Sequence, residues 1–140
     1  MFRYKPLPSD IKTRLPLAAE YLGSHSEVIC AYLFGGLARG EHRLLSDVDI
    51  AVYLSDNADA ADVKLDVLGK LIDILGTDEI DLVILNTAPP SLVMNVLRNK
   101  RVLADNEPAK RHRFESLSFR KYFDFLPVEL GMLKKGVAHG

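Results

Sequence analysis

A run of seven residues from Val28 to Phe34 (VICAYLF) constrains the fold of this chain most. It is rich in β-branched and aromatic residues and apolar at every position, so a strand built from it would be hydrophobic on both faces. Such a strand is typical of the buried centre of a sheet. Gly35 and Gly36 follow directly and are predicted to break the strand. The sequence therefore predicts a central strand with a bend at its end.

Hydrophobic periodicity predicts further elements around this strand. Their order predicts an α+β domain of two layers, in which helices pack on a small mixed β-sheet. The expected elements are strands at 28–34, 46–54, 80–85 and 101–104, and helices at about 10–22, 63–75, 91–97 and 107–125. Gly76 is expected to end the second helix. The apolar residues expected on one side of that helix are Val63, Leu65, Val67, Leu68, Leu71, Ile72 and Leu75.

Composition narrows the class of protein. The 140 residues are expected to form one domain, 1–140, with a C-terminal helix and tail from about residue 107. A formal net charge of -1 gives no general attraction to polyanions, so neither a membrane nor direct nucleic-acid binding is expected. The single cysteine, Cys30, is expected to be a small buried group rather than a reactive thiol. Without a disulfide, a signal-like N-terminus or a membrane-length apolar stretch, the expectation is a cytoplasmic protein.

Two acidic residues stand at the start of the second predicted strand. Because strand side chains alternate, Asp47 and Asp49 should project from one face about 7 Å apart along the strand. Two carboxylates beside a hydrophobic strand repel each other and lose hydration, so a cation is needed to compensate them. Mg²⁺ prefers oxygen ligands of this kind together with phosphate oxygens and water. The pattern therefore indicates a candidate Mg²⁺ site.

Asp81 supplies a third carboxylate at the start of the next apolar strand. If the two strands pair, all three acids meet, and three carboxylates can hold two metal ions. One ion would bind a triphosphate, and the other would lower the pKa of an attacking hydroxyl. Asp81 is also the natural candidate to receive the proton of that hydroxyl.

The glycine bend completes the candidate site. Gly35 and Gly36 allow the backbone N–H groups to approach a phosphate closely, and a helix start there adds favourable partial positive charge. Arg39 would lie one turn further on, where it could pair with a phosphate or with an acid of the site. Ser46, directly before Asp47, is a further candidate for nucleotide contact. A glycine pair alone usually marks only a turn, but its combination with three spaced acids favours a functional site.

These residues resemble the nucleotidyltransferase superfamily that includes DNA polymerase beta and kanamycin nucleotidyltransferase. The signature of that superfamily is Gly-Ser, a short spacer, Asp-x-Asp and a third acid on a later strand. The chain is most similar to the minimal nucleotidyltransferases of prokaryotes, which are commonly encoded beside a small helical HEPN protein and act as antitoxins. The resemblance covers about Val28 to Leu85 and, less distinctively, Tyr122-Phe123-Asp124.

The resemblance implies a polymerase beta-like fold and transfer of AMP from ATP to a tyrosine hydroxyl of a HEPN ribonuclease, which is thereby silenced. Asp47 and Asp49 would be ligands of two Mg²⁺ ions, Asp81 a ligand and the base, and Gly35 and Gly36 the phosphate loop. Position 36 departs from the family, which usually has serine there. The hydrogen bond lost is worth about 1 kcal/mol.

Two alternatives remain open at this stage. Gly36 is compatible with a non-catalytic antitoxin that neutralises its partner by binding alone. Transfer to a small-molecule hydroxyl is the other alternative, although such enzymes are generally longer. The ribonuclease pattern of HEPN proteins, an Arg followed four to six residues later by a His, does not occur, so the chain is a poor candidate for the toxin.

The C-terminal third carries a basic run and several aromatic residues. The run from Lys110 to Lys121 could bind an acidic or RNA-like partner, but Glu115 and Asp124 interrupt the charge, which favours a solvated helix face. Tyr122 and the nearby phenylalanines are interpreted as core or partner interface rather than as a base-stacking platform.

Overall fold

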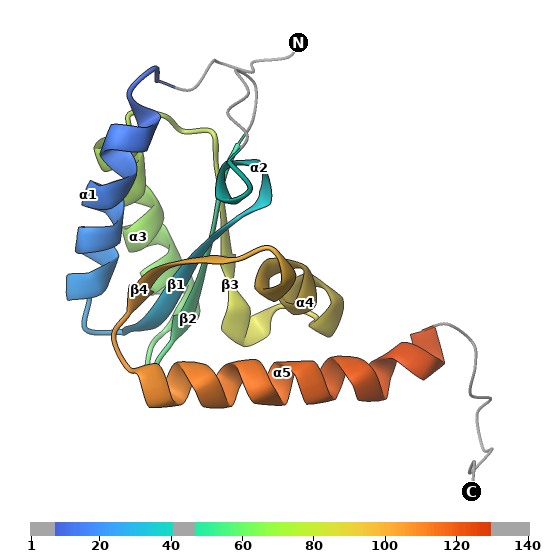
Figure 1. Cartoon of the computed structure of the whole chain (residues 1–140). Coiled ribbons are helices and arrows are strands. Elements are labelled where there is room, and N and C mark those ends of the chain that lie inside the picture. Colours follow the sequence, from blue (N-terminus) through green and yellow to red (C-terminus); the bar gives the residue numbers. More distant parts are fainter. Residues whose placement is uncertain (1–7, 41–46, 130–140) are drawn as a thin grey trace, which may run out of the picture.

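The computed structural model describes residues 8–40 and 47–129, the last five of these as backbone alone. Four strands form one sheet in the order β3-β2-β1-β4, with helices packed against it (Figure 1). The elements are α1 (Ile11–Ser24), β1 (Val28–Phe34), α2 (Gly35–Ala38), β2 (Val48–Leu54), α3 (Ala60–Leu75), β3 (Ile80–Ile84), the 3₁₀ turn η1 (Leu85–Thr87), α4 (Pro90–Arg98), β4 (Arg101–Asp105) and α5 (Pro108–Glu129). The predicted α+β class with a small mixed sheet is confirmed.

The sheet is mixed because β1 pairs antiparallel with both β2 and β4, whereas β2 and β3 run parallel. All seven residues of β1 are buried, as predicted for a central strand without a polar side. The strand has the predicted bounds, Val28–Phe34, because Gly35 follows with a positive φ of 72°, which an extended strand excludes.

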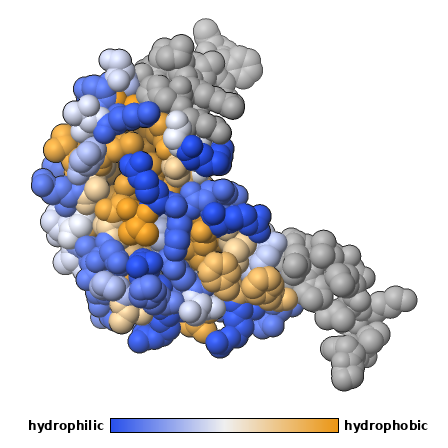
Figure 2. Space-filling view, viewed as in Figure 1, coloured by the Kyte–Doolittle hydropathy of each residue, from blue (hydrophilic) through white to orange (hydrophobic). Residues whose placement is uncertain are grey.

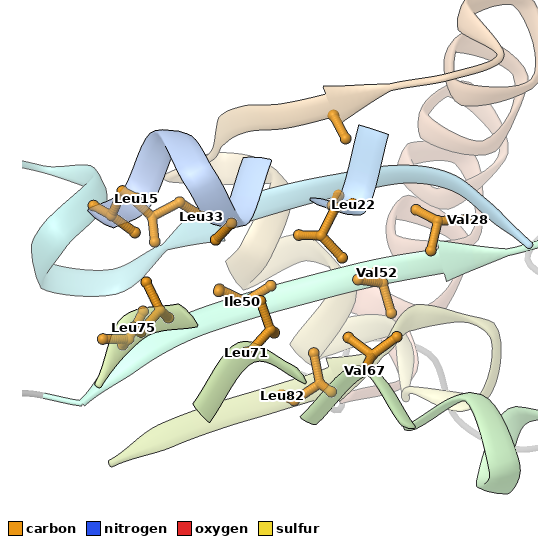
Figure 3. Packing of buried hydrophobic residues seen from close by; sticks show 14 of the residues in the cluster. Leu15, Leu22, Val28, Leu33, Ile50, Val52, Val67, Leu71, Leu75 and Leu82 are labelled. Atoms are coloured by element: carbon orange, nitrogen blue, oxygen red, sulfur yellow. The ribbon is translucent and has the colours of Figure 1, made fainter. Parts of the chain in front are cut away.

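One face of the sheet, here called the aliphatic face, carries Leu33, Ile50 and Leu82. It is covered by α1 and α3, whose apolar side chains pack directly against the strands (Figure 3). The buried residues that these two helices contribute are Ile11, Leu15, Ala18, Leu22, Val63, Val67, Leu71 and Leu75. This packing forms the larger hydrophobic core of the molecule.

The boundaries of α3 follow from its flanking residues. The Asp59 side chain accepts a hydrogen bond of 3.1 Å from the backbone N–H of Asp62 and so caps the first turn. Gly76 ends the helix with a φ of 71°, as predicted. The prediction that Leu65 shares the buried side of this helix is wrong, since its side chain is 72% exposed. It lies off the stripe of residues four apart that runs from Val63 to Leu75.

The other face, here called the acidic face, carries Phe34, Asp49 and Asp81, which are partners across the strands. Apolar residues of α4 and Phe114 of α5 cover another part of this face, where they pack with Tyr32 and Ala51. The rings of Tyr53 and Phe114 stack 4.1 Å apart, which joins β2 to α5.

A polar cluster around Glu115 fixes α5 to the acidic face. Glu115 Oε2 accepts hydrogen bonds from the Tyr32 hydroxyl at 2.8 Å, Lys100 Nζ at 2.7 Å and Arg111 Nη1 at 3.1 Å. Burial alone would raise the pKa of Glu115, but these donors outweigh it and lower the pKa. The cluster joins β1, α5 and the residue that precedes β4, so α5 is held in a defined position.

Cys30 is fully buried in β1, and burial raises the pKa of its thiol to about 11, so it is a small core residue as expected. In the described ranges, the helices include none with the length and apolar character of a membrane span.

Candidate active site

The pairing of β2 with β3 brings two of the predicted acids together. Asp49 and Asp81 are partners in the parallel register, on neighbouring strands that lie about 4.8 Å apart. Val48 donates its backbone N–H to the carbonyl of Glu79 at 2.9 Å, and this bond sets the register at the start of the pair. Because residues in register point to the same side, both carboxylates project from the acidic face.

The third predicted acid, Asp47, directly precedes β2 and is exposed. The pKa of Asp49 is raised to about 6, first by burial and then by the negative charges of Asp81 and Asp47. All three acids therefore interact electrostatically. With all of them ionised, Asp49 experiences the negative charges of two neighbouring carboxylates and the positive charge of Arg39.

The glycine bend touches this acid cluster directly. Phe34 is the cross-strand partner of Asp49, so the next residue, Gly35, lies beside the Asp49 side chain. A Cβ atom added to Gly35 would lie 3.1 Å from Asp49 Cγ and would overlap a carboxylate oxygen. Together with its φ of 72°, this contact means that only glycine fits at position 35.

The short helix α2 begins at this bend and positions Arg39. The backbone N–H of Arg39 donates to the carbonyls of Gly35 and Gly36, both at 3.2 Å, which closes the turn. The positive charge of Arg39 lowers the pKa of Asp49, against the larger effects that raise it. Arg39 therefore lies close enough to Asp49 for the two charges to interact. Ser46, the remaining predicted contact, lies outside the described residues.

The donor set of this site fits a hard divalent cation. Carboxylate oxygens on neighbouring strands, with an excess of negative charge, are the ligands that Mg²⁺ takes up in proteins. Within 8–40 and 47–129, however, no three His, Cys, Asp or Glu side chains are already grouped closely enough to share one ion. Asp49 and Asp81 are the pair in register, and Asp47 would complete the set from the preceding loop position.

The acidic face has a second feature, a groove of about 530 Å³ between α4 and α5. The sequence patterns did not indicate this groove. Tyr53 and Asn86 line it, and neither was predicted to be a site residue. Tyr53 lies four positions after Asp49 on the same strand, so strand alternation alone places both side chains on one face. Asn86 could not have been found in this way, because its amide is bound to the backbone of Leu54 from a separate segment.

Comparison with known proteins decides the family. The family model "Polymerase beta, Nucleotidyltransferase" matches residues 18–109, which contain the bend, Arg39 and all three acids. The chain belongs to this nucleotidyltransferase family. The matched region ends where α5 begins, so the nucleotidyltransferase match does not include most of that helix. No protein of curated function matches the chain.

Solved structures resemble this nucleotidyltransferase over most of its length. A chain of a toxin–antitoxin complex with AMP-PNP is 26% identical, with 81% of this chain and 90% of the other covered and a TM-score of 0.67. A second similar structure is a variant of an MntA–HpeT toxin–antitoxin complex in which two aspartates two positions apart are replaced by glutamate. The matching chain is 24% identical, with 81% of this chain and 87% of the other covered and a TM-score of 0.65.

A third similar structure comes from Shewanella oneidensis. It is a complex of a tri-AMPylated HEPN toxin with an MNT antitoxin. The matching chain is 23% identical, with 82% of this chain and 91% of that chain covered and a TM-score of 0.60. At these identities the likeness establishes the polymerase beta-like fold of this nucleotidyltransferase.

Proposed function

We propose that this chain is a cytoplasmic antitoxin that transfers AMP from ATP to a partner HEPN toxin. The acceptor group is the hydroxyl of a tyrosine on that toxin. The observation that carries the proposal is the in-register pairing of Asp49 with Asp81 beside Gly35, in a chain of the nucleotidyltransferase family. The similar complexes support the choice of substrates, because one contains AMP-PNP and another an AMPylated HEPN toxin.

The residues of the site have distinct roles in this proposal. Two Mg²⁺ ions would be held by Asp47, Asp49 and Asp81. When bound, the ions would neutralise the carboxylates and stabilise the charge that develops on the triphosphate. The N–H groups at Gly35 and Gly36 would bind phosphate oxygens at the start of α2, and Arg39 would pair with the same phosphates.

The transfer itself requires one proton acceptor. The hydroxyl oxygen of the acceptor attacks the α-phosphorus of ATP, the bond from that phosphorus to the bridging oxygen breaks, and pyrophosphate leaves. Asp81 is exposed at the edge strand β3 and would take the proton of the attacking hydroxyl. Asp49 is more buried and packed against Gly35, which suits it to a fixed role as a ligand rather than to proton transfer.

The test is a mass measurement on the partner. A HEPN partner protein is incubated with the chain, ATP and Mg²⁺, and a gain of one or more AMP groups on a tyrosine is expected. Asp49→Asn should abolish the gain, a loss of at least about a thousandfold, and so should EDTA. Asp73→Asn, an exposed acid on α3, is the matched control and should retain full activity. An unmodified partner with the wild-type chain would refute the transfer.

A second candidate is an antitoxin that neutralises by binding alone. Gly36 favours it, because the residue provides no hydroxyl for the triphosphate. A growth assay separates the two functions. Cells that express the toxin with the Asp49→Asn chain should grow if binding suffices, and should stop growing if neutralisation depends on AMP transfer.

A further inference from the structure

The groove between α4 and α5 combines an apolar floor with a basic rim. Its floor includes Ile29, Leu85 and Val93, and the stacked rings of Tyr53 and Phe114 form one wall. Figure 2 shows hydrophobic surface in the region of α4 and α5, bordered by hydrophilic side chains. Leu117 lines the groove although its side chain is 42% exposed, so it offers apolar surface to a partner.

Three cationic side chains of α5 line the same groove, Lys110, Arg113 and Lys121, against one acid, Asp56. Their spacing along the helix places them on the side that carries Leu117. Lys110 is paired with Glu107 at 3.1 Å, whereas no ion pair of Arg113 or Lys121 occurs among the described residues. The groove therefore has cationic capacity that its own residues do not use.

The groove and the acids lie on one face of the molecule. Tyr53 follows Asp49 by four positions along β2, a rise of about 13 Å, and its side chain points to the same side. In Figure 1 α2 lies at one end of the sheet and α5 runs across the other. A protein seated in the groove is thus close enough to present one of its residues to the acids.

The composition of the groove indicates the chemistry of its occupant. An apolar floor with a cationic rim complements a protein segment that carries an apolar side chain flanked by carboxylates. A nucleic acid would match the rim but would leave Leu117 and the apolar floor without a partner. The chain as a whole, with a net charge of -1, also has no general attraction to polyanions.

We propose that the α4–α5 groove is the docking site for the protein that receives AMP, which it binds through an acidic segment with an apolar anchor. The inference rests on the proposed function for the identity of that protein, the HEPN partner. Docking at one end of the acidic face would hold the acceptor while its hydroxyl reaches the acids at the other end. The groove then determines which protein is modified, and the acids determine the reaction.

The experiment measures affinity and catalysis separately. Binding of the HEPN partner to the full chain is measured by calorimetry for Arg113→Glu/Lys121→Glu and for the control Lys12→Glu/Lys70→Glu. The control makes the same change of charge on α1 and α3, which cover the aliphatic face. The groove variant should bind at least tenfold more weakly, and the control within twofold of the wild type. Leu117→Ser should weaken binding at least threefold, whereas Leu65→Ser, another exposed leucine, should not.

Kinetics show whether the groove acts in docking alone. The groove variant should raise the KM for the partner at least tenfold and leave kcat at saturating partner within threefold. Its affinity for ATP with Mg²⁺ should equal that of the wild type, which also shows that it is folded. Equal partner affinity of groove and control variants would overturn the docking site. The docking site would also be overturned if the groove variant lost binding to an RNA oligonucleotide but still bound the partner. The groove would then be a nucleic-acid site.

The same measurements keep the two proposals apart. If the partner binds through the groove and no AMP is transferred, the docking site stands and the transferase proposal fails. If AMP is transferred at the wild-type KM by the groove variant, the transferase stands and the docking site fails.

Discussion

The two faces of the sheet differ in what they contain. The aliphatic face is packed by α1 and α3 with Leu, Ile, Val and Ala side chains, and its large residues such as Ile50 and Leu71 are fully buried. The acidic face carries Asp49, Asp81, the Glu115 cluster and the α4–α5 groove. Because alternate residues of one strand serve the two faces, the larger hydrophobic core and the acids are separated by strand parity rather than by distance along the chain.

The largest effect on stability is expected on the aliphatic face. Leu71 is fully buried between the strands and α1, so Leu71→Ala should lower the free energy of unfolding by about 3 kcal/mol. Denaturant unfolding measures this change, and Leu65→Ala on the same helix should change it by less than about 0.5 kcal/mol. AMP transfer by Leu71→Ala, assayed well below its melting temperature, should stay within twofold of the wild type. A large loss of activity in the folded variant would contradict the separation of the two faces.

Gly35 combines a positive φ with a close approach to Asp49, so its replacement should affect stability and activity together. Gly35→Ala places a Cβ against the Asp49 carboxylate at a φ of 72°, and we expect a loss of about 2 kcal/mol in unfolding free energy. The displaced Asp49 should lower AMP transfer by more than tenfold.

Gly76→Ala is the matched control for that change. Gly76 has nearly the same φ, 71°, but a new Cβ would meet only the flexible end of Arg14. It should cost about 1 kcal/mol and leave activity unchanged. Equal losses of activity in the two variants would show that the contact between Gly35 and Asp49 has no special role.

A smaller effect, of opposite sign, is expected from Asp49. Its pKa is raised to about 6 in the folded chain from an ordinary value of 3.8, so the folded state binds the proton more tightly than the unfolded state. The unfolding free energy should therefore fall as the pH rises from about 4 to about 6, and the penalty should be complete above that range. After a discount for partial solvent access, Asp49→Asn should stabilise the metal-free chain at pH 7.5 by about 1 kcal/mol while abolishing transfer.

Thermal unfolding from pH 4 to pH 8 measures this prediction. The wild type should lose stability across the window, whereas Asp49→Asn should lose less. Mg²⁺ with ATP should raise the melting temperature of the wild type at pH 7.5 but not that of Asp49→Asn, because only the ionised acid attracts the cation. A variant less stable than the wild type at pH 7.5 without metal would contradict the proposed electrostatic penalty.

Much of the fold was predictable because its signals are local. The uninterrupted apolar run of β1 and the glycine after it determine the strand and its end, and the stripe from Val63 to Leu75 determines α3. Leu65 was misplaced because hydrophobicity alone does not distinguish a leucine on the core side from one two positions away. The helical spacing of the buried residues is the stronger signal.

The site was predictable in composition but not in geometry. The sequence indicates three acids and a glycine bend, but it does not contain the parallel register that makes Asp49 and Asp81 partners. Arg113 lines the same groove as Leu117, which only the placement of α4 beside α5 reveals. Contacts between distant segments, such as Tyr32 with Glu115, leave no trace in local periodicity.

The register of β2 and β3 has a consequence for how such a chain could evolve. A slip by one residue would turn Asp81 toward the helices of the aliphatic face, because successive strand residues point in opposite directions. The short connection from Gly76 to Glu79 determines that register, through the bond from Val48 to Glu79. A change in that loop that shifted the register by one residue would therefore inactivate the chain while every acidic residue remained in its sequence. The activity of such a chain thus depends on the register of these two strands as well as on the aspartates themselves.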